Sequence, residues 1–314
     1  MKRIVVTGGA GFIGSHLCEF LISQGHKVVC IDNFSTGSRR NISHLMTEGD
    51  NFSFIKHDIT EPFHVMGGID EIYNLACPAS PKAFTENPIE TLKASFMGTL
   101  NILDLARTAG AKFLHASTSE VYGEALSHPQ KETDLGNTDT QSSRACYSEG
   151  KRVAEALVAE YRRKYNLNTK IVRIFNVYGS RMQSDDGRLM PNVINQLLQD
   201  KPVTIYGDGE HTRSFCYVSD MVTGLVEMMS RDEAGPINIG NPNEISIKSC
   251  IKTMAQLLDI ADPVFEYKEL PSGDCSRRCP DIMLAKEKLG WQPVVSLEDG
   301  LKQTIDYFKE CAKV

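Results

Sequence analysis

Tyr147 and Lys151 are the residues whose types and spacing most directly suggest chemistry. Because they are four positions apart, they lie on one face if their segment is helical. A neighbouring ammonium lowers the pKa of a phenol, since it stabilises the phenolate. The pair therefore predicts a tyrosine base that works near neutral pH, beside a lysine free to bond a ribose hydroxyl. Tyr-x-x-x-Lys is also common on ordinary helices, so this prediction depends on further signals.

One further signal is the segment 117–123, Ser-Thr-Ser-Glu-Val-Tyr-Gly, which follows a predicted strand. Thr118 ends that strand and is expected to share a substrate hydroxyl with Tyr147. Ser119 and Glu120 follow directly. The strand end brings these polar side chains toward the same place as the tyrosine and lysine, which favours a catalytic role for the pair.

The other signal is a glycine-rich turn near the N-terminus, with Gly8, Gly11 and Gly14 spaced three apart between a predicted strand and helix. Such a turn lets the backbone approach a pyrophosphate, while the helix N-terminus offers N–H groups and a positive dipole. Asp32 ends the second strand and suits a ribose diol, but its carboxylate would repel a 2′-phosphate. The turn therefore predicts NAD as the cofactor, in preference to NADP.

The predicted cofactor contacts lie at the ends of successive strands and on the catalytic helix. For Asp58, contact with the adenine edge and a surface cap remain open alternatives. The full predicted set is Gly8, Gly11, Phe12, Ile13, Gly14, Asp32, Asn33, Asp58, Ile59, Leu75, Ala76, Tyr147 and Lys151.

The elements that must position these residues alternate along the first half of the chain. Short apolar runs at 4–6, 28–31, 52–55, 72–75, 113–117 and 170–174 predict strands buried on both faces. Helical spacing at 15–24, 88–109 and 147–165 separates several of them. This alternation is typical of an α/β fold, a Rossmann-type doubly wound parallel sheet.

Beyond about residue 175, turns rich in Gly, Pro and charged residues become frequent. Short strands at 203–205 and 237–239 mix there with helices at 191–198, 220–229, 247–258 and 297–311. We expect an NAD-binding domain over residues 1–178, with a return near 215–235. A smaller α/β substrate domain is expected over residues 179–314.

Composition limits the classes of partner. The 314 residues carry a formal charge of −6, so no broad basic surface predicts binding to nucleic acid. No apolar run approaches the roughly 18 residues of a membrane helix. Nine scattered cysteines in apolar segments predict reduced thiols in the cytoplasm. Cys275 and Cys279 are four apart without a second ligand pair nearby in the sequence, so no metal site is expected.

The motifs together resemble the extended short-chain dehydrogenases/reductases that act on nucleotide sugars, and among these the UDP-glucuronic acid decarboxylases. The resemblance covers nearly the whole chain. Besides the glycine turn and the catalytic segments, it includes the sequences at 32–34, 76–81, 145–152, 173–176, 186–188, 212–215 and 289–291. Ser148 and Ser180 depart from the family pattern, where Asp and Pro are usual, but neither position removes a reacting group.

The residues at positions 119 and 120 decide which subgroup of the family the chain resembles. The related 4,6-dehydratases carry an Asp where this chain has Ser119, and the 4-epimerases lack the Glu at position 120. The resemblance therefore implies oxidation of UDP-glucuronate at C4, loss of CO2 from C5 through a UDP-4-keto intermediate, and reduction to UDP-xylose. Tyr147 would take the C4 hydroxyl proton. For Glu120 two roles remain open, ordering a water or handling the C5 proton.

The resemblance also implies the substrate contacts. Asn176 and Arg213 correspond to groups that hold the diphosphate, and Arg188 to a contact near the same ligand. Arg278 corresponds to an arginine at the sugar end, where it would orient the carboxylate with Ser119 and assist reprotonation. Arginine suits bidentate recognition of phosphate and carboxylate. Lys93 is expected to reach the sugar or an acidic neighbour.

The sequence also allows two alternative functions and predicts an oligomeric state. The first alternative is a nucleotide-sugar 4-epimerase or 4,6-dehydratase of the same superfamily. The second is a non-catalytic NAD-sensing protein, which predicts a broken Tyr147–Lys151 pair, whereas the pair is intact. Apolar residues beyond one stripe on the helices at 88–109 and 147–165 predict a homodimer.

Overall fold

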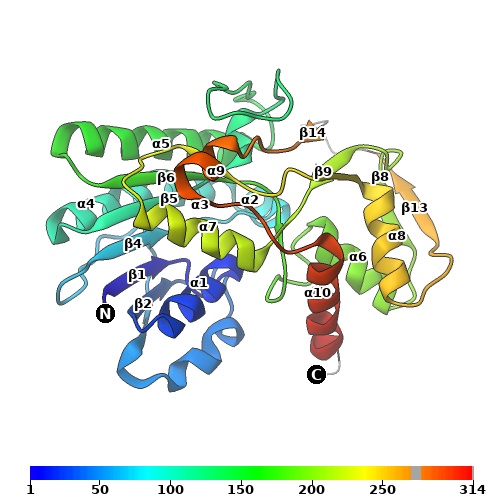
Figure 1. Cartoon of the computed structure of the whole chain (residues 1–314), viewed down its shortest axis with the longest axis horizontal. Coiled ribbons are helices and arrows are strands. Elements are labelled where there is room, and N and C mark those ends of the chain that lie inside the picture. Colours follow the sequence, from blue (N-terminus) through cyan, green and yellow to red (C-terminus); the bar gives the residue numbers. More distant parts are fainter. Residues whose placement is uncertain (270–276, 313–314) are drawn as a thin grey trace.

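The computed structural model describes residues 1–269 and 277–312, and a seven-stranded parallel sheet forms its larger part (Figure 1). The strand order is β11-β6-β5-β4-β1-β2-β3. These strands are β1 (Arg3–Thr7), β2 (Lys27–Asp32), β3 (Phe52–Lys56), β4 (Glu71–Asn74), β5 (Lys112–Thr118), β6 (Thr169–Ile174) and β11 (Ile237–Ile239). The Rossmann-type sheet predicted from the alternating runs is confirmed.

Successive side chains of the central strands pack into separate cores on the two faces of the sheet. Val5 and Val29 face one core, while their neighbours Ile4, Val6 and Val28 face the other. Strand side chains alternate in direction, so strands covered on both sides read as continuous apolar runs. The helices α1 (Phe12–Ser23) and α7 (Val218–Ser230) cover one face, and α4 (Thr99–Ala109) and α5 (Ala145–Tyr165) cover the other.

The expected helix at 88–109 is interrupted. It consists of α3 (Pro88–Lys93), a π-helical turn η3 (Ala94–Gly98) and α4. This turn is closely packed on two sides. On one side, Gly98 lies so near Ile59 that a Cβ on the glycine would be 2.5 Å from the Ile59 side chain. On the other side, a Cβ on Gly150 would lie 2.9 Å from the Ser95 hydroxyl. Apolar periodicity does not distinguish such a turn from regular helix.

Within the described residues, the smaller part of the molecule holds three short sheets and the C-terminal helix, toward the right of Figure 1. Its strands are β7 (Val177–Tyr178) with β10 (Cys216–Tyr217), β8 (Val203–Tyr206) with β13 (Phe265–Lys268), and β9 (Thr212–Ser214) between β12 (Glu244–Ser246) and β14 (Arg277–Arg278). Its helices are α6 (Leu189–Leu198), α8 (Ile247–Leu257) and α10 (Leu297–Ala312).

The chain passes back to the large sheet after β10. Helix α7 packs against α1, and β11 pairs with β6 and forms one edge of the large sheet. The strand at 237–239, expected among the elements of the smaller part, therefore belongs to the large sheet. Helix α9 (Met283–Leu289) packs against it. The remaining short elements are α2 (Pro81–Glu86), η1 (Arg39–Thr47), η2 (Gly49–Asn51) and η4 (Ser119–Tyr122).

Within the described residues, no helix combines the length and the apolar character needed to cross a bilayer.

Candidate active site

A cavity of about 1610 Å³ runs from the glycine turn to the smaller part of the molecule. Every residue that the sequence singled out for the site lines it. These residues are Gly8, Gly11, Phe12, Ile13, Gly14, Asp32, Asn33, Asp58, Ile59, Leu75, Ala76, Lys93, Thr118, Ser119, Glu120, Tyr147, Lys151, Asn176, Arg188, Arg213 and Arg278. Parallel strands end at the same edge of a sheet, which explains how residues so far apart in the chain share one cavity.

The glycine turn leaves no room for side chains between β1 and α1. A Cβ on Gly14 would lie 2.1 Å from the carbonyl oxygen of Gly8. Gly8 has a φ of +69°, and a Cβ there would lie 2.9 Å from the backbone of Ala76. Helix α1 begins at Phe12 just beyond this turn, so its first N–H groups adjoin the cavity. This geometry fits the close approach of a pyrophosphate.

Asp32 lies beside that turn at the end of β2. Its Oδ2 accepts a hydrogen bond from the Ala10 N–H at 3.0 Å, and its Oδ1 accepts one from the Phe34 N–H at 2.8 Å. Burial raises the pKa of this carboxyl, and the two backbone hydrogen bonds oppose the shift. The position and acceptor chemistry fit a ribose diol.

Asp58 satisfies its carboxylate locally. Its Oδ1 accepts hydrogen bonds from the Thr60 N–H and hydroxyl, at 2.9 and 2.8 Å, and its Oδ2 accepts one from Asn33 at 2.8 Å. These hydrogen bonds outweigh partial burial and lower the pKa of Asp58. These contacts are those of a local cap, and because the residue also lines the cavity, contact with an adenine edge stays a prediction.

Tyr147 is buried on α5 at the centre of the cavity wall. Its ring stacks on Phe84 of α2, with centroids 5.2 Å apart and planes 7° apart. Burial raises the pKa of the phenol, whereas a hydrogen bond with Thr118 and the charge of Arg188 lower it in part. The predicted grouping of Tyr147 with Thr118 is thus present.

Lys151 lies on the same helix, as the spacing predicts, but its contact differs from the expected one. Its Nζ donates a 2.7 Å hydrogen bond to the carbonyl oxygen of Ala116 on β5. Burial lowers the pKa of Lys151, and burial also raises the pKa of Tyr147. In this arrangement burial raises the pKa of Tyr147 instead of the expected lowering, and the ammonium bonds the strand carbonyl.

Glu120 lies between two guanidinium groups. Its Oε1 accepts hydrogen bonds from Arg144 Nη2 and from Arg278 Nη1, each at 2.7 Å. All three side chains are largely buried. Burial alone would raise the pKa of this carboxyl, but the two arginines together lower it to about 2. Glu120 is therefore a carboxylate at neutral pH.

Arg144 is a site residue that the sequence analysis missed. It lies three residues before Tyr147, at the N-terminal end of α5, and lines the same cavity. Its guanidinium also lies over the Phe84 ring, 5.5 Å from the centroid. Phe84 thus contacts both Arg144 and Tyr147. The available signal was a basic residue directly before the helix that carries the predicted base.

The arginines expected to bind substrate come from different segments of the smaller part. Arg213 and Arg278 are register partners on the parallel strands β9 and β14, and both are buried. Arg188 lies 3.6 Å from Asp186, and Asn176 donates to the Ser214 carbonyl at 3.4 Å. Lys93 is exposed at the cavity wall. The cavity wall therefore carries several positive groups in addition to the glycine turn.

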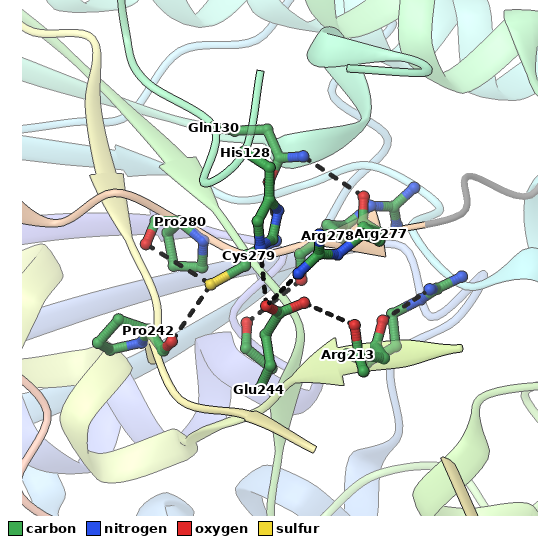
Figure 2. Close-up of polar contacts among 11 residues, drawn as sticks. His128, Gln130, Arg213, Pro242, Glu244, Arg277, Arg278, Cys279 and Pro280 are labelled. Carbon is green, nitrogen blue, oxygen red and sulfur yellow. Dashed lines mark hydrogen bonds and ion pairs between the residues drawn. The ribbon is translucent and has the colours of Figure 1, made fainter. Parts of the chain in front are cut away.

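A cluster beside β14 holds three potential metal ligands, His128, Glu244 and Cys279, with their ligand atoms within 4.8 Å of one another. Figure 2 shows Glu244 in contact with His128 at 2.8 Å and with Arg277 at 3.2 Å. Burial raises the pKa of Cys279 to about 11, so the thiol is protonated at neutral pH. Cys275 lies outside the described residues. The contacts present are those of an ion-pair cluster that holds β14.

The two departures from the family pattern lie away from the cavity wall. Ser180 contacts His16, whose Nε2 lies 3.0 Å from the Ser180 carbonyl oxygen. The Ser148 hydroxyl donates to the Arg144 carbonyl at 3.4 Å. Neither serine lines the cavity.

Comparison with known proteins places the chain in a family. A family model described as GDP-mannose 4,6 dehydratase matches residues 5–304. The chain is 48% identical to UDP-glucuronic acid decarboxylase 1 of Arabidopsis thaliana, over 98% of this chain and 70% of that protein. It is also 48% identical to UDP-glucuronic acid decarboxylase 1 of Xenopus tropicalis, over 98% of this chain and 72% of that protein.

Solved structures of sugar-nucleotide enzymes superpose on nearly the whole chain. A UDP-glucuronic acid 4-epimerase from Bacillus cereus, solved with UDP-glucuronic acid and NAD, superposes with a TM-score of 0.88 at 32% identity, covering 98% of this chain and 99% of that one. A UDP-glucose 4-epimerase from Thermotoga maritima, solved with UDP-glucose, gives a TM-score of 0.90 at 31% identity, with 99% of both chains covered. The chain belongs to the GDP-mannose 4,6-dehydratase family, within the extended short-chain dehydrogenases/reductases.

Proposed function

We propose that this chain is an NAD-dependent enzyme that converts UDP-glucuronate to UDP-xylose and CO2. The observation that carries the proposal is the buried Glu120 carboxylate between Arg144 and Arg278, in the same cavity as Tyr147 and Lys151. One part of the cavity offers a proton acceptor, and another offers arginine for a substrate carboxylate. The decarboxylase names of relatives 48% identical to the chain support the same reading.

The residues around the glycine turn would hold NAD. Gly8, Gly11 and Gly14 leave space for the pyrophosphate, and Asp32 presents its carboxylate to the adenosine ribose. When bound, NAD supplies a hydride acceptor and donor for the sugar C4, so the overall reaction is redox-neutral. The NAD named in the structure of the Bacillus cereus epimerase supports this assignment.

Tyr147 and Thr118 would handle the proton of the C4 hydroxyl. The Thr118 hydrogen bond and the Arg188 charge both stabilise the phenolate of Tyr147 and offset in part the burial that raises its pKa. Lys151 donates to the Ala116 carbonyl and lines the cavity, where its ammonium would also bond a ribose hydroxyl of the cofactor. The stacked Phe84 ring fixes the orientation of the phenol.

Arg278 and Ser119 would orient the C5 carboxylate. A ketone at C4 is β to that carboxylate, so loss of CO2 leaves an enolate that the ketone stabilises. Because the pKa of Glu120 is about 2, this residue is ionised at neutral pH and holds no proton to give. Of its two open roles, we therefore favour ordering the water that reprotonates C5.

A 4-epimerase acting on the same substrate is the second candidate. The structural match to the Bacillus cereus UDP-glucuronic acid 4-epimerase favours it specifically. We rank it below decarboxylation because the Ser119–Glu120 pair of this chain follows the decarboxylase pattern, and the relatives at 48% identity carry the decarboxylase name.

Product analysis separates the candidates directly. The purified chain is incubated with UDP-glucuronate and NAD, and the nucleotide sugars are analysed by mass spectrometry. We expect a product lighter than the substrate by one CO2 that co-elutes with UDP-xylose. A product of unchanged mass identifies an epimerase, and loss of one water identifies a dehydratase. Either result would refute the decarboxylase proposal.

We also propose that two copies associate through α3, η3 and α5. These elements pack together, and their outer faces expose Leu92, Phe96, Met97 and Val153, each between 37% and 43% accessible. Contiguous exposed apolar side chains mark interaction surfaces, and a symmetric contact of such helices buries them on both copies.

Light scattering tests the dimer. The wild type should give the mass of two chains, and Phe96→Glu should shift it toward one, because a charge enters the apolar contact. Leu126→Glu changes another highly exposed apolar residue outside these helices and is the matched control. A wild type with the mass of one chain at micromolar concentration would contradict the proposed contact.

A further inference from the structure

Arg278 lines the cavity from the short strand β14. β14 has two residues, Arg277 and Arg278, and pairs only with β9 in the described sheet. Arg278 is separated from its partner Glu120 by 158 positions, yet the two side chains meet at 2.7 Å in a largely buried place. Such a short strand needs additional contacts to hold a guanidinium in one position.

Gln130 provides these contacts from the side away from β9. Its N–H donates to the Cys279 carbonyl at 2.9 Å, and its side-chain Oε1 accepts from the Cys279 N–H at 2.7 Å. Its Nε2 donates to the Arg277 carbonyl at 3.4 Å, a bond that is visible in Figure 2. Gln130 is 3% exposed. One buried glutamine thus bonds the backbone on both sides of Arg278.

Asn238 connects this glutamine to the segment that carries Glu120. Its Nδ2 donates to the carbonyls of Gln130 and Asp281, at 3.0 and 3.2 Å. Its Oδ1 accepts from the Tyr122 hydroxyl at 2.7 Å. Tyr122 lies on η4, the same short turn as Glu120. Asn238 has no exposed surface and lies on β11, within the large sheet.

We propose that Gln130 and Asn238 are positioning residues that fix the Glu120–Arg278 pair for recognition of the substrate carboxylate. The contacts form a closed path from Glu120 to Arg278, through the β14 backbone to Gln130 and Asn238, and back through Tyr122 to η4. Buried polar networks with every member bonded define one geometry, because each alternative leaves a polar group unpaired. This inference rests on the proposed function, since it assigns Arg278 to the carboxylate.

The path differs from the ion-pair cluster on the outer side of β14. There, Glu244 bonds the exposed Arg277 and the Thr212 hydroxyl, the latter at 2.6 Å, and neither contact reaches Glu120. The Gln130–Asn238 path is instead buried and touches the backbone next to Arg278 itself. Weakening it should therefore affect carboxylate recognition selectively.

The test measures the affinities of UDP-glucuronate and UDP-glucose, which differ by the carboxylate, by calorimetry on the NAD-loaded chain. Gln130→Met keeps the side-chain length and removes the amide, with both its acceptor oxygen and its donor nitrogen. We expect it to weaken UDP-glucuronate binding about ten-fold, with UDP-glucose affinity unchanged. Tyr122→Phe removes one hydroxyl of the path and should weaken UDP-glucuronate about three-fold. Tyr178→Phe also removes one buried hydroxyl bond, to the Leu297 carbonyl, and is the control.

Equal losses for both ligands would show a merely structural role and overturn the inference, as would unchanged affinities in both variants. If Gln130→Met does not fold, Tyr122→Phe decides alone. A second readout is the acid limb of the binding profile, which should move to higher pH because a displaced Arg278 no longer lowers the pKa of Glu120 as far. A wild type that forms no UDP-xylose refutes the proposed function, whereas the two affinities still test the positioning role.

Discussion

The two ends of the cavity are built in different ways. At the cofactor end, Gly8, Gly11 and Gly14 belong to one strand–turn–helix unit, and Asp32 ends the neighbouring strand in register. At the sugar end, Glu120 meets Arg144 and Arg278, which lie 24 and 158 positions away in the chain. The first site depends on local backbone geometry, and the second depends on long-range ion pairs inside a buried region.

This difference explains how a common sheet can carry different chemistries. The cofactor end is fixed by steric constraints within one turn, so few substitutions are tolerated there. The sugar end depends on side chains brought in from η4, α5 and β14, and single changes in these segments alter what the cavity recognises. Three substitutions test this comparison, from the largest expected effect to the smallest.

Tyr147→Phe should have the largest effect, because it removes the group proposed to accept the C4 hydroxyl proton. Without that step, neither hydride transfer to NAD nor loss of CO2 can follow. The phenyl ring keeps its stack on Phe84. We expect UDP-glucuronate binding close to wild type and a ~10²–10⁴-fold loss of turnover. Single-turnover absorbance should show no reduced nicotinamide, and no CO2 should be released. Formation of UDP-xylose at the wild-type rate would remove Tyr147 from the mechanism.

Glu120→Gln should affect only the sugar end. The substitution keeps the shape and removes the charge between Arg144 and Arg278. We expect reduced nicotinamide to appear in the first turnover, while UDP-xylose formation falls ~10²-fold. If substrate binding and both steps fall together instead, Glu120 only holds the sugar. Normal product formation would exclude it from the site.

The same substitution changes the pH dependence of stability. The folded-state pKa of Glu120 is lowered from 4.5 to about 2, so its ion pairs stabilise the fold above about pH 4.5. That stabilisation is lost as the pH falls toward 2. Glu120→Gln should therefore flatten the fall in thermal stability over this range. An identical pH dependence in the variant and the wild type would contradict the ionised state assigned to Glu120.

Gly14→Ala should affect only the cofactor end, and by less. Its methyl group would meet the Gly8 carbonyl at 2.1 Å, so the turn must open. We expect NAD affinity to fall about ten- to a hundred-fold. Gly68→Ala, where a Cβ meets no atom within 4 Å, is the matched control. Calorimetry with NAD provides the measurement, and equal affinities in both variants would contradict the steric account.

The sequence predicts the cofactor end well because its determinants are local. The glycine spacing and a following strand-end carboxylate need only neighbouring residues, and the sheet order then brings them together. The contact of Lys151 was harder to predict, because helical spacing sets a face but not the direction of a long side chain. The carbonyl of Ala116 competes for the ammonium, and nothing near Lys151 in the sequence indicates this.

The sugar end is less accessible to sequence reasoning. Only the family resemblance predicts Arg278 as a site residue. The sequence does not predict Arg144, because its contact with Glu120 depends on where the segment 124–144 returns to the sheet. Gln130 and Asn238 carry no motif, and their role follows only from the buried hydrogen bonds that connect η4 with β14. Long-range polar contacts of this kind appear only once the fold is known.

The central claim, that one cavity both handles the C4 proton and releases the substrate carboxylate, is tested most directly with UDP-glucuronate labelled in its carboxylate carbon. The NAD-loaded wild type is incubated with this substrate, and label is measured in released CO2 and in the nucleotide sugar. We predict one labelled CO2 for each UDP-xylose formed and no label in the product. Label retained in a converted nucleotide sugar would contradict the account.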